Sequence, residues 1–340
     1  MITRVYRLTG PKRFETFLQE VSLEKNENVL VRPDYLSICA ADERYYLGLR
    51  KKEILQKKLP LALIHEAIGR IVYDPQGGFS VGEPVVLIPN QPWKGPLEAK
   101  ENYDRRSVFL SSGGDGFMQE MISIPRSCVL SLPDRGKYVY VLSELLSVAI
   151  NAVDNLQREL IPGNSIFGLW GDGNVSFVTA LTLKVKYPEA RILIFGINES
   201  KLRMFSFADR CFLTEHIPAG LQVDHCFECV GGQASGRAIE QMIGLIRPQG
   251  TISLMGVSED PVGINTRMVL EKGLKLFGNS RSGKEDFEQA ISIIHQREAI
   301  RGYLETMISE IVEVRELSHI YHAFEQDQLN DFKTVMKWEI

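Results

Sequence analysis

The feature that most constrains the fold is an alternation of strand and helix signals that begins near Ser165. Ile166–Trp170 is typical of a buried strand, Val175–Lys186 of a helix, and Arg191–Phe195 of the next strand. Further strands are predicted at 223–229, 251–255 and 274–278, with a helix at 233–246 and a turn at 247–250. Strands that alternate with helices form βαβ units. We therefore expect this part of the chain to be α/β with a doubly wound parallel sheet.

A glycine-rich turn, Gly171-Asp172-Gly173, joins the first strand of this series to the first helix. The sequence matches G-x-G-x-x-G except at its last position, where Ser176 replaces glycine and is expected to loosen helix–strand packing slightly. Such a turn lets backbone amides at a helix N-terminus approach a pyrophosphate. The strand–turn–helix context favours a Rossmann dinucleotide-binding domain. The residues expected to contact the cofactor here are Gly171, Gly173, Asn174 and Val175.

The second strand of such a sheet usually ends in an acidic residue that binds the ribose 2′-hydroxyl of NAD. We align Gly196 with that position, where a carboxylate would repel a 2′-phosphate. Its absence, followed by Ser200, Lys201 and Arg203, favours NADPH over NAD, unless Lys201 and Arg203 are only a solvated helix face. Glu199 lies close enough to the position to keep NAD open as the alternative.

The first third of the chain has a different pattern, with short strand-like runs separated by Gly and Pro turns. These runs lie at 27–32, 69–73 and 83–88, and they predict an irregular, β-rich domain. After the α/β part comes a helix-rich tail that ends in a strand-like segment, Thr334–Trp338. We expect one domain of residues 1–147 completed by 280–340, and a dinucleotide-binding domain of residues 148–279.

The bulk properties narrow the functional class. The 340 residues suffice for two domains, and a net charge of −4 gives no polybasic argument for nucleic acid or membrane binding. We find neither a signal peptide nor an apolar run of membrane-spanning length. Five cysteines without regular spacing do not form a disulfide framework, so a cytoplasmic location is expected.

Four polar residues, Cys39, His65, Glu66 and Glu144, lie among apolar or strand-like segments. Cysteine, histidine and carboxylate side chains are the types that hold catalytic zinc, commonly with three protein ligands and one open position. Each residue by itself has an ordinary structural explanation, since an isolated cysteine is usually a small buried hydrophobe. Together they indicate a metal site.

With these residues identified, the chain resembles the zinc-dependent medium-chain dehydrogenase/reductase superfamily along essentially its whole length. The resemblance rests on Cys39-Ala40-Ala41-Asp42, His65-Glu66, Glu144–Val148, Gly171-x-Gly173 and Glu228-Cys229-Val230-Gly231. It implies a GroES-like β-rich catalytic domain beside the Rossmann domain, and Val230 in the cofactor site. It also implies catalytic zinc on Cys39, His65 and Glu144, with Glu66 close enough to enter the metal's shell.

Two departures from the family pattern matter. Many members hold a second, structural zinc on four cysteines, whereas residues 89–113 contain none, so we expect one catalytic zinc and no structural zinc. The family usually has Ser or Thr two positions after the zinc cysteine, where it begins a proton relay, but this chain has Ala41. A methyl group cannot pass a proton, so water, a substrate hydroxyl or another side chain, with Tyr45 and Glu66 as candidates, is expected to take that role.

The resemblance narrows to bacterial members that reduce D-ribulose 5-phosphate to D-ribitol 5-phosphate with NADPH and zinc. It rests on the segments at 37–42, 63–66, 170–174, 227–232 and 279–283. It implies a small phosphorylated sugar as substrate, with Arg281 and Arg44 as candidates for its phosphate unless they are ordinary surface arginines. It further implies a homodimer whose product a partner cytidylyltransferase converts to CDP-ribitol for teichoic acid or capsule synthesis.

Two other functions stay open on the sequence. One is an NAD-dependent zinc polyol dehydrogenase that oxidises a neutral, sorbitol-like sugar alcohol. The other is a non-catalytic dinucleotide-binding protein, because a fold by itself does not establish an activity.

Overall fold

The structure is a computed structural model that describes residues 1–21, 27–134, 137–160 and 165–340. It divides into two compact units. Unit 1 comprises Met1–Ser147 and Ser282–Ile340, and unit 2 comprises Val148–Arg281. The chain therefore leaves unit 1 once and returns to it, so its last 59 residues belong with its first 147.

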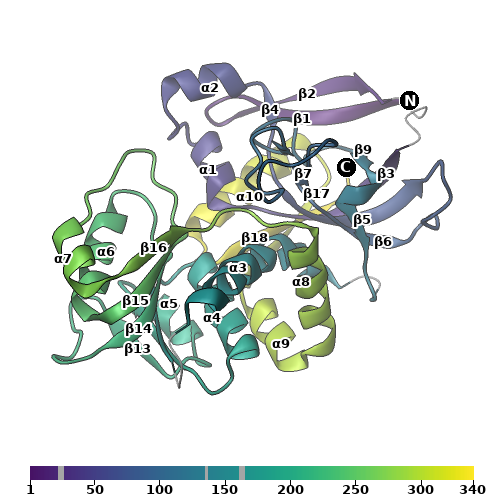
Figure 1. Ribbon diagram of the computed structural model, residues 1–340. Helices are drawn as coiled ribbons and strands as arrows, with labels where there is room; N and C mark the ends of the chain where they lie inside the picture. Colours follow the sequence, from purple (N-terminus) through teal and green to yellow (C-terminus); the bar gives the residue numbers. More distant parts are fainter. Residues whose placement is uncertain (22–26, 135–136, 161–164) are drawn as a thin grey trace. The chain divides into compact units, whose positions relative to one another are not determined.

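Unit 2 is built on a parallel sheet with the strand order β13-β12-β11-β14-β15-β16. Its strands are β11 (Ile166–Trp170), β12 (Arg191–Gly196), β13 (Arg210–Leu213), β14 (Val223–Glu228), β15 (Ile246–Leu254) and β16 (Lys275–Gly278). This is the 3-2-1-4-5-6 order of a doubly wound dinucleotide-binding sheet. The predicted α/β class is confirmed, and Figure 1 shows strands β14, β15 and β16 side by side.

The helices of unit 2 bury apolar faces against this sheet. They are α4 (Asn174–Lys186), α5 (Glu199–Met204), α6 (Ala234–Leu245), α7 (Thr266–Lys272) and the end of α3 (Ser143–Leu156). In α6, Ala238, Ile239, Met242 and Ile243 recur at helical spacing and pack in the same core as Trp170. Spacing of this kind predicts a helix with one buried face, which the structure has.

Two details of unit 2 differ from the prediction. Residues Arg247–Gly250 were expected to form a turn, but β15 already begins at Ile246 and runs through them. The pairing of β14 with β15 is irregular at this point, and Gln249 adopts a positive φ of 65°. A Pro-Gln-Gly sequence therefore makes an irregularity inside a strand rather than a separate turn. Strand β13 and helix α7 were not predicted.

Unit 1 contains most of the antiparallel structure. Its main sheet has the order β10-β6-β5-β3-β18-β17, with β9 also paired to β3. Its strands are β3 (Asn28–Ser37), β5 (Glu66–Tyr73), β6 (Pro84–Leu87), β9 (Ile122–Pro125), β10 (Val129–Ser131), β17 (Ile308–Val314) and β18 (Lys333–Trp338). A smaller sheet joins β2 (Arg13–Glu20), β1 (Ile2–Gly10) and β4 (Leu61–Ala62), and β7 (Asn90–Gln91) pairs with β8 (Val108–Phe109). Because β18 pairs with β3 next to Ser37, residues near position 333 lie beside the segment that leads to Cys39.

The helices of unit 1 come from both ends of the chain. They are α1 (Ala40–Tyr46), α2 (Lys52–Lys58), α8 (Lys284–Gln296), α9 (Glu298–Thr306) and α10 (Leu317–Leu329). Short 3-10 turns occur at η1 (Arg126–Cys128), η2 (Tyr138–Leu142) and, in unit 2, η3 (Gln157–Glu159). The prediction of a helix-rich tail is incomplete, because the tail also contains strand β17. In the second half of β17, Val312 and Val314 are buried while Ile311 and Glu313 are exposed, as in an edge strand with one buried face.

One helix has the length and composition of a membrane span, contrary to the sequence-based expectation. Residues Tyr138–Leu156 form a 19-residue stretch with a mean hydropathy of 1.3. Of this stretch, 83% is buried inside the structure, which is typical of the core helix of a folded domain. Its apolar composition therefore reflects packing within the protein.

Candidate active site

The turn between β3 and α1 places Cys39 at the start of a helix. Cys39 is the N-cap of α1, and the Asp42 side chain folds back so that its Oδ2 accepts a hydrogen bond from the Cys39 amide at 3.2 Å. The other carboxylate oxygen of Asp42 accepts from the Ile64 amide at 2.9 Å. One buried carboxylate thus ties the residue before His65 to the turn that carries Cys39, which brings two distant parts of the sequence together.

The backbone before His65 is strained. Ile64 is fully buried and has a φ of 70°, in the left-handed region that a β-branched residue rarely adopts. Strain of this kind persists where the surroundings hold it, and it clusters at functional sites. The hydrogen bond from Ile64 to Asp42 is one such restraint.

The His65 ring is buried and is held through one of its nitrogens. His65 Nδ1 lies 2.9 Å from Ser111 Oγ and 3.7 Å from Asp42 Oδ2, and the ring packs against Phe109 at 5.4 Å between centroids. Burial lowers the pKa of His65, but the neighbouring Asp42 and Cys39 outweigh it and hold the pKa well above its usual value. Because Nδ1 faces Ser111 and Asp42, Nε2 is the nitrogen that a metal ion would take.

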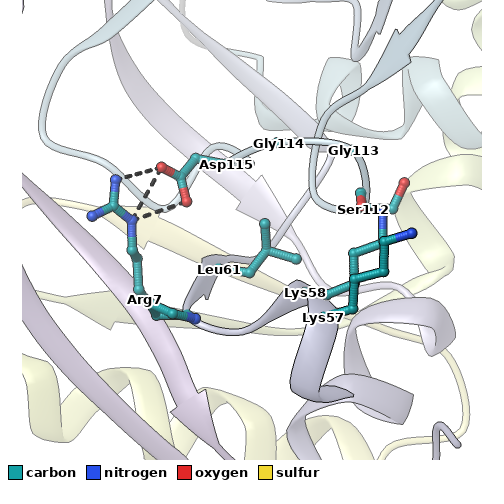
Figure 2. Close-up of a pocket in the computed structure, with 9 residues that line it drawn as sticks. Arg7, Lys57, Lys58, Leu61, Ser112, Gly113, Gly114 and Asp115 are labelled. Carbon is teal, nitrogen blue, oxygen red and sulfur yellow. Dashed lines mark hydrogen bonds and ion pairs between the residues drawn. The ribbon is translucent and has the colours of Figure 1, made fainter. Parts of the chain in front are cut away.

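The loop that follows Ser111 is held by contacts with Arg7 and Lys58, and Figure 2 shows its residues Ser112–Asp115. Asp115 pairs with Arg7 of β1 at 2.6 Å and accepts a hydrogen bond from the Ala62 amide at 2.9 Å. Lys58 Nζ donates to the Ser112 carbonyl at 2.6 Å. Arg7, Lys58, Ser112 and Asp115 line a cavity of about 350 Å³, but the Arg7 and Lys58 side chains are engaged in holding the loop. We therefore interpret the residues that line this cavity as a structural support for Ser111 and, through Ser111, for His65.

Glu66 begins β5 and is paired with a lysine from the other end of the chain. Lys333 Nζ lies 2.5 Å from Glu66 Oε1 and also donates to the Ile38 carbonyl at 2.8 Å. Both side chains are buried, at 1% exposure for Lys333 and 0% for Glu66. Burial lowers the pKa of Lys333, but Glu66 outweighs it, so the net shift is upward. Glu66 Oε2 is buried and has no hydrogen-bond partner among the described residues.

Glu144 is the second residue of α3 and is 5% exposed. Burial raises the pKa of Glu144 to about 7, and the nearby Glu66 and Asp42 add to the rise, while His65 and Lys333 oppose it. A carboxyl group crowded by other carboxylates in this way is relieved by a cation. Such a concentration of carboxylates around one buried carboxyl group is typical of a metal site.

The predicted ligands meet in two overlapping groups. His65, Glu66 and Glu144 have ligand atoms within 4.8 Å of one another, and so do Cys39, Asp42 and His65. His65 belongs to both groups, while Cys39 and Glu144 do not share one among the described residues. A half-buried Cys39 and buried His and carboxylate donors, together with the unbonded Glu66 Oε2, fit a zinc ion.

The remaining predicted residues of unit 1 lie on α1. Tyr45 is 5% exposed, and the guanidinium of Arg50 lies 5.0 Å from the centre of its ring. Arg44, half-buried, precedes it on the same helix. Ser111 and Lys333 were not singled out from the sequence, because their contacts with His65 and Glu66 bridge 46 and 267 residues.

Unit 2 contains a cavity of about 470 Å³ at the carboxyl ends of its central strands. Gly171 has a φ of 122°, and a Cβ there would lie 2.9 Å from the Cys229 carbonyl oxygen, so this turn requires glycine. Of the predicted cofactor residues, those that line the cavity are Gly171, Gly173, Gly196 and Val230. Asn174 and Val175 form the first turn of α4, and Ser200 and Lys201 the first turn of α5. Residues that the sequence analysis missed include Thr214, Arg237 and Gln241.

Two protein families match this chain. The alcohol dehydrogenase GroES-like domain matches residues 25–134, and the zinc-binding dehydrogenase family matches residues 213–296. The ribulose-5-phosphate reductase of Bacillus spizizenii is 45% identical over 100% of both chains. The enzyme of that name from Streptococcus pneumoniae is 43% identical over 100% of this chain and 98% of its own. The chain belongs to the zinc-dependent medium-chain dehydrogenase/reductase superfamily.

Solved structures agree with this placement of the dehydrogenase. The crystal structure of S. aureus TarJ in complex with NADPH is 40% identical and superimposes with a TM-score of 0.89, covering 100% of both chains. The L-idonate 5-dehydrogenase of Escherichia coli, at 19% identity and a TM-score of 0.86, shares the fold. The predicted superfamily and its GroES-like and Rossmann folds are confirmed.

Proposed function

We propose that this dehydrogenase reduces D-ribulose 5-phosphate to D-ribitol 5-phosphate with NADPH and one zinc ion. One observation carries the proposal. The chain is 43–45% identical over 99–100% of its length to four ribulose-5-phosphate reductases, and in unit 1 its His65 lies in a donor group with Glu66 and Glu144 and in another with Cys39 and Asp42. The balanced reaction consumes one hydride from NADPH and one proton, and it converts the C2 carbonyl of the ketose to a secondary alcohol.

Cys39, His65 and Glu144 are the residues that would hold the zinc, with Glu66 at its side. Zinc in such a site acts as a Lewis acid that polarises the carbonyl of the substrate. The surrounding side chains hold the donors in place. Ser111 and Asp42 contact the His65 nitrogen Nδ1, which leaves Nε2 for the metal. Lys333 holds one oxygen of Glu66 and thereby orients the other.

The proton must reach the product oxygen without the hydroxyl that most relatives carry two residues after the zinc cysteine, because Ala41 has none. We propose Tyr45 or Glu66 as its source. A Tyr45→Phe variant that loses turnover while Glu66→Gln keeps it would assign the role to Tyr45, and the reverse result would assign it to Glu66. Both variants need a zinc measurement, since Glu66 also borders the metal group.

For the cofactor, we propose contacts from the glycine turn, the strand ends and the first turns of α4 and α5 in unit 2. The proposed residues are Gly171, Gly173, Asn174, Val175, Gly196, Ser200, Lys201 and Val230. NADPH supplies the hydride. For the substrate phosphate, Arg281 and Arg44 stay the proposed residues. Burial lowers the pKa of Arg281, and Arg281 has a φ of 60°.

The product points to a downstream reaction. We propose that a cytidylyltransferase uses ribitol 5-phosphate to make CDP-ribitol for teichoic acid or capsule synthesis. We also expect the dehydrogenase to act in the cytoplasm as a homodimer.

The test is a matrix of substrates and cofactors with purified protein. NADPH oxidation with ribulose 5-phosphate should exceed NADH oxidation with the same substrate, and a zinc chelator should abolish it. NAD reduction with sorbitol or ribitol should be slower. Faster NAD reduction with the neutral polyols would indicate a polyol dehydrogenase instead. No turnover in any combination, with no zinc retained, would indicate a non-catalytic dinucleotide-binding protein.

A further inference from the structure

A positively charged side chain lines the cofactor cavity of unit 2. Arg237, on α6, lines this cavity together with Asp172, Gly196 and Glu215. Its side chain is exposed, and no carboxylate is paired with it in the part of the chain that the structure describes. A guanidinium at the rim of a nucleotide cavity, with its hydrogen-bond donors unused, is suited to a phosphate group.

The helix face that carries Arg237 is fixed to the sheet. Gln241, one turn further along α6, donates to the Thr214 carbonyl at 3.0 Å and accepts from the Trp170 indole at 3.0 Å. Trp170 is stacked on Phe195 with ring centres 4.0 Å apart. Residues four apart lie on the same face of a helix, so the contacts of Gln241 also hold Arg237 toward the strand ends.

The end of β12 cannot carry the acidic residue that binds a ribose 2′-hydroxyl. A Cβ at Gly196 would lie 2.7 Å from both Cβ and Oδ2 of Asp172 and 2.9 Å from Leu202 Cδ2. Asp172 occupies this space and accepts hydrogen bonds from the amides of Ile197 at 2.7 Å and Asn198 at 2.8 Å. Its carboxylate is therefore engaged in holding the backbone after β12.

Of the residues first expected to bind a 2′-phosphate, Ser200 takes part in the N-cap of α5 with its hydroxyl and amide, and Lys201 with its amide only. Asn198 Oδ1 accepts hydrogen bonds from the amide and hydroxyl of Ser200 and from the amide of Lys201. Neither Ser200 nor Lys201 is among the described residues that line the cavity. Glu215, an exposed carboxylate, does line it and would oppose a phosphate, so Arg237 is the charge that has to favour one.

We propose that Arg237 binds the 2′-phosphate of NADPH and is the main determinant of the preference for NADPH over NADH. The inference deepens the proposed function and rests on its use of NADPH. The interaction is two N–H donors of one guanidinium on two phosphate oxygens, made from α6 rather than from the loop after β12.

The experiment measures the binding of 2′,5′-ADP and of ADP to the full-length protein by calorimetry. The wild type should bind 2′,5′-ADP more tightly than ADP. Arg237→Gln should weaken 2′,5′-ADP binding roughly ten- to a hundredfold, as expected for lost hydrogen bonds to a charged group, and leave ADP binding unchanged. Arg191→Gln is the matched control, because Arg191 is an exposed arginine at the opposite, amino end of β12. It should change neither affinity.

Arg237→Lys keeps the charge without the guanidinium fork and should retain part of the preference; it carries the test if Arg237→Gln does not fold. A wild-type preference for 2′,5′-ADP that survives in Arg237→Gln would overturn the inference. A larger loss in Lys201→Gln than in Arg237→Gln would also overturn it. Equal binding of 2′,5′-ADP and ADP by the wild type would instead contradict the proposed use of NADPH, which separates the two failures.

Discussion

At the residue scale, the contact between Lys333 and Glu66 joins two buried charges, which are 1% and 0% exposed. Two such charges cost much desolvation, and their attraction offsets it only when the geometry is good and the remaining polar atoms are satisfied. Here the Ile38 carbonyl accepts a further hydrogen bond from Lys333, while Glu66 Oε2 has no partner among the residues described. Glu66 Oε2 is therefore free to take a further positively charged partner, and the proposed zinc ion is such a partner.

Lys333→Met should destabilise the protein more without zinc than with it. Breaking a buried ion pair by removing one partner costs roughly 3–5 kcal/mol, because the other charge stays buried. A zinc ion beside Glu66 would replace part of the lost positive charge and reduce that cost. Urea denaturation of the variant, with zinc and with chelator, measures the difference.

The control for this variant lies on the same strand. Lys337 is about one-third exposed and pairs with Glu313 and Glu339. Surface pairs contribute about 0–1 kcal/mol, so Lys337→Met should change stability little under either condition. Equal destabilisation of Lys333→Met with and without zinc would show that Glu66 lies outside the reach of the metal.

At the element scale, the segment between β7 and β8 is held by hydrogen bonds to one carboxylate. Asp104 is buried, accepts from the amides of Glu98 and Arg106 at 3.0 Å each, and pairs with the Arg106 guanidinium at 2.6 Å. This segment leads to β8 and then to Ser111, so its order matters for the loop beside His65.

Asp104→Ala should lower the free energy of unfolding by on the order of 2 kcal/mol, because it removes hydrogen bonds to a charged, buried acceptor. Hydrogen exchange should rise in residues 95–110. Glu98→Gln is the control, since the Glu98 side chain is 81% exposed and should matter little. Unchanged exchange in Asp104→Ala would mean that other contacts hold the segment.

Strand β14 carries a buried histidine, His225, which is 0% exposed. Its Nδ1 lies 2.8 Å from Thr251 Oγ1 of β15. Burial lowers the pKa of His225 to about 4, although Asp224 opposes the shift. The unfolded chain, with the ordinary value of 6.5, takes up a proton first as the pH falls. The contribution of His225 is therefore complete above pH 6.5 and is lost as the pH falls toward 4.

The free energy of unfolding should be about 2 kcal/mol lower at pH 5 than at pH 7 because of His225. His225→Asn should flatten the decline in stability between pH 7 and pH 5, as measured by urea denaturation at each pH. His216→Asn replaces an exposed histidine and should leave the decline as it is in the wild type. A wild-type decline that persists in His225→Asn would assign the acid sensitivity to other groups.

At the scale of the whole molecule, the sequence predicted best where local signals agree. Apolar strand, glycine turn and helix follow one another at 166–186, and the structure has β11, the turn and α4 there. The sequence-based prediction was least accurate where contacts between distant residues determine the secondary structure. Ile246–Leu254 is one strand despite its Pro-Gln-Gly, because pairing with β14 and β16 outweighs the turn signal. Strand β17 lies in a tail that looked helical, because its strand structure depends on pairing with β18.

In the candidate site, too, residues with a local sequence signal were predicted and residues placed by long-range contacts were not. Cys39, His65, Glu66 and Glu144 were recognisable because their side-chain types are those of zinc ligands, and the structure brings their neighbourhoods together. Lys333 and Arg237 carry no such signal. A lysine in a strand and an arginine on a helix are ordinary surface residues until the fold places one against Glu66 and the other at a nucleotide cavity.

The central claim is that a zinc ion held through Cys39 serves the reduction of ribulose 5-phosphate by NADPH. The most direct measurement is that rate, with zinc content determined on the same sample, for Cys39→Ser and for Cys211→Ser. Cys211 is an exposed cysteine of unit 2, so its variant should keep both zinc and turnover. Cys39→Ser should lose both together. Full turnover by zinc-free Cys39→Ser protein would contradict the claim.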